Sequence, residues 1–274
     1  MGEKQEFSFG DNSVARAYDN VLVQVLFEPW AKSLVNEYQP WEGKRVLDLA
    51  TGTGIVAQLL SGEVGASGEV IGTDINSEML ALAKKRCEGL IPEKNFIESP
   101  AHPLDVTDNS FDFVVCQQGF QFFPDKGAAA SEIYRVLIDR GKVVASTWKP
   151  VEYCEYFGAI CDALIEVGEP EMADMMKVPF DFMPEVDLTA CFDDAGFTNV
   201  ELKNEEKSLV IRGGLNEAVD VAYATPIGPK LNALSEKLQT QFRETFANIL
   251  GKISNGGNDM GIMVSNVLSA EKPG

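Results

Sequence analysis

Basic residues are scarce in this sequence of 274 residues, and histidine occurs only once. Lys and Arg number 23 against 42 Asp and Glu, which leaves a formal net charge of −19. A chain with this charge repels the phosphates of nucleic acids and the headgroups of anionic lipids. We therefore expect neither nucleic acid nor a membrane among its partners.

Metal-binding patterns and cysteine pairs are also missing. The five cysteines stand apart without a C-x-x-C motif, and His102 is the only histidine that could complete a metal set. Cysteines that are odd in number and scattered are typical of reduced intracellular proteins. No apolar run approaches the ~18 residues of a membrane-spanning helix. These absences predict a soluble cytoplasmic protein that has no metal site and does not insert into membranes.

The sequence does contain a regular alternation of β-rich and helical segments. We expect strands at 45–50, 69–73, 95–98, 111–116 and 142–148, and helices at 55–60, 78–88 and 128–137. This alternation predicts a parallel sheet with crossover helices. Because crossovers are right-handed, the carboxyl ends of the strands share one edge, where ligands bind.

After Pro150 the alternation weakens. We expect a helix over 188–195, strands at 200–203 and 261–268, and one amphipathic helix over 230–253. A single domain then has a core at about 41–149, 186–204 and 259–271, with helical cap segments at about 11–39, 150–184 and 213–257. No cap is long enough for an independent core, so the caps should pack over one sheet edge. The oligomeric state stays open.

A glycine-containing loop, Asp48-Leu-Ala-Thr-Gly-Thr-Gly54, ends the first expected strand and opens a helix. Glycines in this position let a ligand approach backbone amides at a helix N-terminus, which predicts a cofactor loop. Gly52-x-Gly54-x-x-Ala57 also matches the dinucleotide fingerprint, and Asp74 has the spacing of its ribose-binding acid. The glycines alone therefore leave the cofactor open.

The charge at the mouth of the loop is more selective than the glycines. The carboxylate of Asp48 would oppose a pyrophosphate, whereas it suits a ligand with an ammonium or sulfonium group. This favours S-adenosylmethionine over a nicotinamide dinucleotide. Asp48 and Asp74 also have a purely structural interpretation, because Asp is common at helix N-termini.

Further motifs, taken together with the loop and Asp74, show a family resemblance. They are Asp108-Asn-Ser-Phe-Asp-Phe-Val-Val115, and Phe122-Phe-Pro-Asp125 followed by Glu132-Ile-Tyr-Arg-Val-Leu137. Together they resemble the class I S-adenosylmethionine-dependent methyltransferases, in the small-molecule branch of type 11 and ubiquinone/menaquinone-type enzymes. The resemblance is close over 46–148 and looser over 195–200. It implies a Rossmann-like α/β fold with a seven-stranded, mostly parallel sheet, one antiparallel strand, helices on both faces and helical cap insertions.

The resemblance also implies cofactor-binding roles for residues at matching positions. The loop residues Ala50, Thr51, Gly52, Thr53 and Gly54 would approach the methionine part of S-adenosylmethionine, with Asp48 at its ammonium and Asp74 at its ribose hydroxyls. Ile75 and Met79 would sandwich the adenine, Ser99, Pro100 and Ala101 would lie at its edge, and Cys116, Gln117 and Gln118 would line the sulfonium end. Relatives commonly carry an acidic residue at the position of Pro100, which leaves Ser99 to compensate, and a Pro-Gly turn at 139–141.

The expected reaction is methyl transfer to O, N or C of a small-molecule acceptor by in-line displacement, which needs no nucleophilic side chain. A base is required only for a hydroxyl or a protonated amine. The candidates are Tyr18, Asp19, His102 and Tyr153, with Gln118 as an orienting group. Two alternatives remain: a catalytically silent S-adenosylmethionine-binding regulator and a dinucleotide-dependent oxidoreductase.

Overall fold

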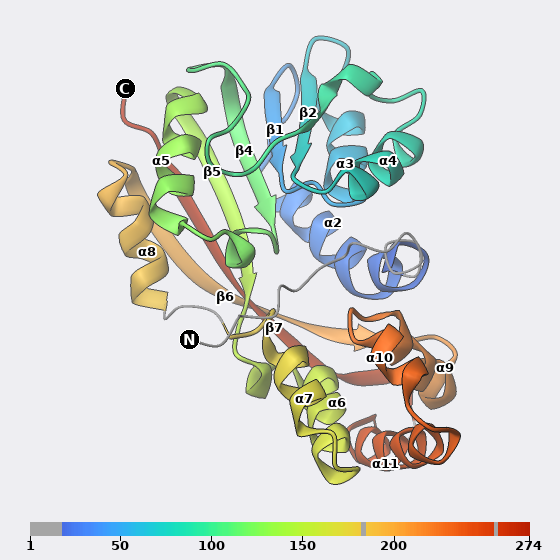
Figure 1. Ribbon diagram of the computed structural model, residues 1–274. Coiled ribbons are helices and arrows are strands. Elements are labelled where there is room, and N and C mark those ends of the chain that lie inside the picture. Colours follow the sequence, from blue (N-terminus) through green and yellow to red (C-terminus); the bar gives the residue numbers. More distant parts are fainter. Residues whose placement is uncertain (1–17, 182–184, 255–256) are drawn as a thin grey trace. The chain divides into compact units, whose positions relative to one another are not determined.

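The structure is a computed structural model that describes residues 18–181, 185–254 and 257–274 (Figure 1). Parts of the expected cap segments, at 11–17, 182–184 and 255–256, lie outside the described residues.

The strands are β1 (Arg45–Leu49), β2 (Glu69–Asp74), β3 (Phe96–Glu98), β4 (Phe111–Gln117), β5 (Leu137–Trp148), β6 (Thr198–Val210) and β7 (Asp259–Glu271). The α-helices are α2 (Glu28–Glu37), α3 (Ile55–Glu63), α4 (Ser77–Arg86), α5 (Lys126–Val136), α6 (Glu155–Glu166), α7 (Pro170–Lys177), α8 (Glu185–Asp194), α9 (Gly214–Val221), α10 (Gly228–Ala233) and α11 (Glu236–Ser254). A π-helix, η1 (Tyr18–Phe27), precedes α2, and short 3-10 turns are η2 (Glu93–Asn95), η3 (Phe120–Phe122), η4 (Val151–Tyr153) and η5 (Ala222–Ala224).

The strands form one sheet in the order β3-β2-β1-β4-β5-β7-β6. β1 to β5 pair in parallel, whereas β7 runs antiparallel to β5. Hydrogen bonds of Thr198 to Glu271 and of Ile211 to Asn258 show that β6 is also antiparallel to β7. The expected seven-stranded sheet with one antiparallel strand is therefore confirmed.

Buried apolar residues explain why the central strands and their helices form. Val46, Leu47 and Leu49 of β1 are almost fully buried, as expected for a parallel strand covered on both faces. The strand order reverses at β1 and β4, and right-handed crossovers then place α3 and α4 on one face and α5 on the other (Figure 1). The carboxyl ends of β1 and β4 meet at this reversal, where ligands bind in sheets of this type.

The chain divides into two compact units, which we call the sheet unit and the helical unit. Among the described residues, the sheet unit comprises 27–148, 185–205 and 265–274, and the helical unit comprises 18–26, 149–181, 206–254 and 257–264. β6 and β7 contribute residues to both units.

The helical unit has an apolar core of its own. The ring of Tyr156 in α6 lies 5.5 Å from the ring of Phe246 in α11, and its hydroxyl donates to the carbonyl of Ala218 in α9 at 2.6 Å. Phe242 stacks on Phe246 at 5.7 Å between ring centroids. Two of the expected cap segments therefore share a core that neither could form alone.

Several expected boundaries differ from the structure. The predicted helix over 230–253 is wrong as a single element, because Leu234 and Ser235 separate α10 from α11. β6 runs to Val210 rather than ending at 203, and β5 begins at Leu137. The Asp139-Arg140-Gly141 segment lies within β5, where the pairing with β4 shifts register and Arg140 has φ 61°.

Candidate functional site

The loop after β1 turns sharply at three left-handed positions. Ala50, Gly52 and Gly54 have φ values of 57°, 55° and 83°. The amide of Thr51 donates to the carbonyl of Thr73 at 2.8 Å, so the loop is fixed to the end of β2. A left-handed alanine costs conformational energy, and such strain is common at ligand sites.

The two glycines of this loop have different surroundings. A Cβ atom at Gly52 would meet nothing within 4 Å, whereas one at Gly54 would lie 3.0 Å from the Cα of Ala83 in α4. Gly54 therefore permits close packing of the loop against α4. Only Gly52 presents its backbone to open space.

Asp48 is buried beneath the loop and holds it from below. Its Oδ2 accepts hydrogen bonds from the Thr51 hydroxyl at 2.6 Å and from the Ala57 amide at 3.0 Å. Burial raises the pKa of Asp48 to about 7, although both hydrogen bonds oppose the shift. Oδ2 of Asp48 therefore has a structural role, because it bonds the loop and the start of α3.

Asp74 at the end of β2 connects the glycine loop to β2 and to the segment that opens α4. Its Oδ2 accepts from the amide of Gly52 and its Oδ1 from the amide of Asn76, each at 2.9 Å. Burial raises the pKa of Asp74, against the effect of these hydrogen bonds. The helix N-cap is Asn76, whose side chain accepts from the Glu78 and Met79 amides. The helix-capping interpretation of Asp74 is therefore wrong.

Residues expected around the adenine lie at the ends of β2 and β3. The side chain of Ile75 is 71% exposed, while Met79 is buried in α4. Ser99 is buried, and its hydroxyl donates to the carbonyl of Pro100 and accepts from the Asp105 amide, both at 3.0 Å. The Ser99 hydroxyl thus shapes the loop that carries Pro100 and Ala101.

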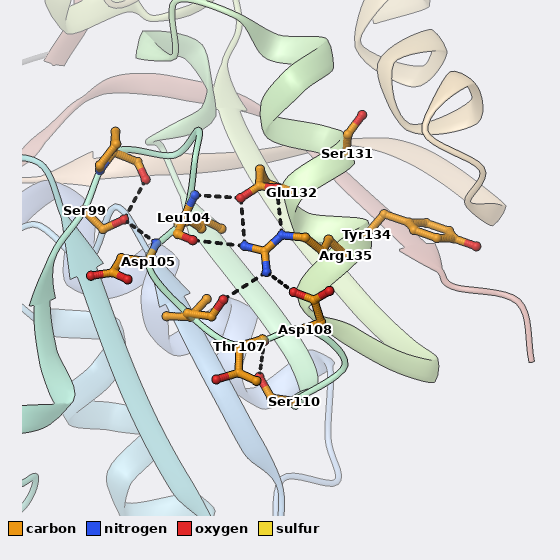
Figure 2. A network of polar contacts seen from close by, with 12 residues as sticks. Ser99, Leu104, Asp105, Thr107, Asp108, Ser110, Ser131, Glu132, Tyr134 and Arg135 are labelled. Atoms are coloured by element: carbon orange, nitrogen blue, oxygen red, sulfur yellow. Dashed lines mark hydrogen bonds and ion pairs between the residues drawn. The ribbon is translucent and has the colours of Figure 1, made fainter.

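Figure 2 shows how this loop is held by α5. The guanidinium of Arg135 donates to Glu132 on the same helix, to Asp108, and to the carbonyls of Leu104 and Val106 at 3.0 Å each. Glu132 in turn accepts from the Leu104 amide at 2.6 Å. The Arg135 guanidinium lowers the pKa of Glu132, which stays ionised.

The end of β4 supplies the residues expected at the sulfonium. Cys116 is fully buried, and burial raises the pKa of its thiol, so the thiol is not reactive. Gln118 has φ 55°, and a Cβ atom at Gly119 would lie 2.6 Å from the Cβ of Ala50. The turn after β4 therefore approaches the glycine loop so closely that only glycine fits at 119.

Known proteins similar to this chain show its family. A family described as "Methyltransferase domain" matches residues 47–145. The ubiquinone/menaquinone biosynthesis C-methyltransferase UbiE of Stenotrophomonas maltophilia (strain K279a) is 38% identical over 215 residues, covering 70% of this chain and 82% of the relative. The chain belongs to the class I S-adenosylmethionine-dependent methyltransferases. The protein of the same name from Xanthomonas oryzae pv. oryzae (strain MAFF 311018) is also 38% identical with the same coverage.

Solved structures agree on the fold of this methyltransferase. Phosphoethanolamine N-methyltransferase 2 of Haemonchus contortus has a TM-score of 0.63 and 18% identity, covering 100% of this chain and 61% of that one. An S-adenosylmethionine-dependent methyltransferase from Aquifex aeolicus has a TM-score of 0.51 and 22% identity, covering 73% and 93%. The family resemblance and the cofactor expected from the sequence are confirmed, and the dinucleotide oxidoreductase alternative is wrong.

The candidate bases of this methyltransferase are divided between the two units. Tyr18, Asp19 and Tyr153 belong to the helical unit, whereas His102 and Gln118 belong to the sheet unit. His102 is exposed in the loop after β3, and Tyr153 lies under the ammonium of Lys149, which is 4.7 Å from its ring centre. Within the described ranges, no group of three His, Cys, Asp or Glu side chains could hold a metal ion, and no helix is long and apolar enough to cross a membrane.

Sequence reasoning missed two contributors to the site. Gly119 carries no motif, and its need for a small residue arises only from the close approach to Ala50. Arg135 lies in the Glu132–Leu137 motif, but its contacts with residues about 30 positions earlier depend on the tertiary fold. The spacing of Glu132 and Arg135 on one helix face was the signal available in the sequence.

We expect Arg135→Ala to lower the free energy of unfolding by about 1–3 kcal/mol, because it leaves loop carbonyls and two carboxylates without their donor. Chemical denaturation would measure the change. The matched control is Arg243→Ala, which removes an exposed ion pair with Asp220 and should cost no more than ~1 kcal/mol. Equal losses in the two variants would contradict a special role for Arg135.

Proposed function

We propose that this methyltransferase transfers a methyl group to a carbon atom of a small aromatic acceptor of the quinone-precursor type. The names of the relatives, which are C-methyltransferases of ubiquinone and menaquinone biosynthesis, support this choice of atom and acceptor. The net charge of −19 favours a small neutral acceptor over a nucleic acid, and the five free cysteines suit a cytoplasmic protein.

One observation carries the proposed cofactor site: Gly52, whose amide donates a hydrogen bond to Asp74, is also the loop glycine where an added Cβ atom would meet nothing within 4 Å. This places loop amides and a carboxylate on adjacent strand ends, as a ligand with both an amino-acid part and a ribose requires. In our proposal Ala50 to Gly54 face the methionine part and Asp74 faces the ribose. Exposed Ile75 covers the adenine, together with Met79 in α4 and Ala101 in the loop after β3.

S-adenosylmethionine, when bound, supplies an electrophilic methyl group on a sulfonium. The chain's own contribution is to orient the two reactants and to exclude water, so no protein nucleophile is needed. The buried thiol of Cys116 remains protonated and takes no part. In the proposed reaction the acceptor carbon would gain the methyl group as the bond to sulfur breaks, and this carbon would lose one proton to bulk solvent or to a base, for which His102 is a candidate.

Two measurements test the proposed function. Thermal shifts should show stabilisation by S-adenosylhomocysteine and none by nicotinamide dinucleotides. Mass spectrometry should then detect one added ring methyl group on a naphthohydroquinone with an unsubstituted ring carbon. Binding of S-adenosylhomocysteine without methylation of hydroquinones, phenols or amines would instead support the silent regulator.

The pH dependence of cofactor binding should identify the partner of the ammonium. Because the pKa of Asp48 is about 7 in the free protein, an ammonium beside it would favour the ionised form and release a proton on binding. We expect the affinity for S-adenosylhomocysteine to rise between pH 5.5 and 7.5 by up to about tenfold per pH unit. Titration calorimetry in buffers of different ionisation enthalpy would count the released protons.

Asp48→Asn is the matched control, and its affinity for S-adenosylhomocysteine should not change over this pH range.

The raised pKa of Asp48 also affects the stability of the free protein, which should fall as the pH rises. Its stabilising contribution is complete below the unfolded value of 3.8 and is lost as the pH rises through about 7. Denaturation of both proteins at pH 5 and pH 8 should therefore show a larger loss for the natural protein than for Asp48→Asn.

A further inference from the structure

Three glutamines lie at the end of β4, just after it and in η3. One end of each amide is fixed by a hydrogen bond, and the other end is buried without a partner among the described residues. The unpartnered atoms are Oε1 of Gln117, Oε1 of Gln118 and Nε2 of Gln121, counting partners among the described residues. Buried polar atoms of folded proteins are almost always hydrogen-bonded, so such a cluster indicates a ligand or ordered water.

The hydrogen bond at the fixed end of each amide determines which atom of that amide has no partner. Nε2 of Gln117 donates to the backbone carbonyl of Phe27 at 3.0 Å, and a carbonyl can only accept. Oε1 of Gln121 accepts from the backbone amide of Trp148 at 3.0 Å, and an amide N–H can only donate. Neither side chain can therefore be turned round without losing its bond.

The orientation of Gln118 follows from a short relay of hydrogen bonds. Its Nε2 lies 2.9 Å from Oγ of Ser265, and that hydroxyl donates its single proton to the carbonyl of Thr147 at 2.8 Å. Ser265 can then only accept from Gln118, which leaves Oε1 of Gln118 as the free acceptor. The Gln118 side chain is 5% exposed.

All three amides are anchored at Trp148 or at one of its direct neighbours. Gln121 bonds the backbone of Trp148 itself, Ser265 is the residue opposite Trp148 in the β5–β7 pairing, and the Phe27 ring lies 6.2 Å from the Trp148 ring. Trp30 packs edge-on against Trp148 at 5.2 Å. The three amides are therefore anchored to the backbone or to the direct neighbours of Trp148, beside aromatic rings of the sheet unit.

We propose that Gln117, Gln118 and Gln121 form the acceptor subsite, which binds an uncharged aromatic ring that carries hydroxyl groups. Ring hydroxyls would donate to the two glutamine oxygens and accept from Nε2 of Gln121, while the ring packs against Trp148. The three glutamines and Trp148 carry no charge, so a phosphate or carboxylate bound by them would face two carbonyl oxygens without a counter-charge from these residues. This inference rests on the proposed function.

Equilibrium binding to the protein loaded with S-adenosylhomocysteine tests the subsite without turnover. The probes are a naphthohydroquinone, naphthalene, naphthoate and phosphoethanolamine, and the readout is tryptophan fluorescence. We expect the natural protein to bind the hydroquinone about 10- to 100-fold more tightly than naphthalene, which has no hydroxyl. Naphthoate and phosphoethanolamine should bind no better than naphthalene, and tighter binding of either would overturn the proposal.

Gln118→Met and Gln121→Met keep the length of the side chain and remove the amide. Each should lower the preference for hydroquinone over naphthalene by about tenfold. Gln121→Met, at a residue with no expected contact with the cofactor, should also leave the affinity for S-adenosylhomocysteine within about twofold. The matched control is Gln239→Met, whose amide bonds carbonyls of Asn232 and Leu234 in the helical unit and should not affect the preference. An undiminished preference in both test variants would mean that water satisfies these amides, and would overturn the subsite.

The outcomes also separate this inference from the proposed function. If the natural protein methylates the hydroquinone and both variants keep its preference, only the subsite fails. If the natural protein does not bind S-adenosylhomocysteine, the proposed function fails instead. Thermal unfolding of each variant checks that it is folded, and a Gln118→Met variant that fails to fold leaves Gln121→Met to decide.

Discussion

Gly52→Val should abolish detectable binding of S-adenosylhomocysteine, with a loss of about 100-fold or more in affinity. Gly52 has φ 55°, and a Cβ atom there would point into open space with nothing within 4 Å. The valine methyl groups would therefore fill the volume that our proposal gives to the methionine part of the cofactor. The β-branched side chain would also strain the loop that donates an amide to Asp74.

Gly89→Val separates the steric effect of Gly52→Val from backbone strain. Gly89 has φ 76° and also has nothing within 4 Å of its added Cβ, but it lies in an exposed turn after α4. Both variants should lose similar stability, about 1–3 kcal/mol for a residue other than glycine at a left-handed position. Only Gly52→Val should lose binding in titration calorimetry. Near-natural affinity in a folded Gly52→Val protein would mean that the loop does not contact the cofactor.

The central strands could be predicted from sequence because their burial on both faces requires continuous apolar runs. β1 and β4 begin at the expected residues, since each run follows polar or turn-forming residues. β6 was harder to predict, because most of its residues are exposed and the charged stretch at 205–207 interrupts the pattern. An edge strand with polar residues on both faces has no periodic signal.

The break between α10 and α11 had a local signal that the long apolar stripe concealed. Ser235 precedes Glu236, and its hydroxyl accepts from the Leu238 amide at 3.4 Å, as at a helix N-terminus. The stripe continued through the break because Leu231 is buried in α10 and Phe242 in α11. Periodicity alone therefore joined two helices that a capping serine separates.

The glycine loop and the carboxylates of Asp48 and Asp74 could be placed at the ends of β1 and β2 from sequence, because the apolar runs before them predict these strands. Their hydrogen bonds could not, since Gly52 and Asp74 meet only when β1 and β2 pair. Of the three glutamines, Gln117 and Gln118 were predicted only as lining residues. Their orientation depends on Phe27 and Ser265, which are distant in sequence.

Asp74→Ala should weaken the binding of S-adenosylhomocysteine by about 3 kcal/mol or more, since each charge-assisted hydrogen bond to a ribose hydroxyl contributes roughly 1.5–3 kcal/mol. Circular dichroism should show a folded protein. Because Asp74 also accepts from the Gly52 amide, a loss of affinity alone could come from a displaced loop. A ligand that lacks one ribose hydroxyl resolves this ambiguity.

A double-mutant cycle compares S-adenosylhomocysteine with its 2′-deoxy analogue on the natural protein and on Asp74→Ala. If Asp74 binds the ribose, removing the hydroxyl should weaken binding to the natural protein about tenfold or more and have little further effect on the variant. Asp105→Ala is the control, because this exposed carboxylate lies in the loop held by Ser99 and should preserve the natural difference between the ligands. If Asp74→Ala discriminates between the two ligands as strongly as the natural protein, Asp74 positions the glycine loop and the ribose is bound elsewhere.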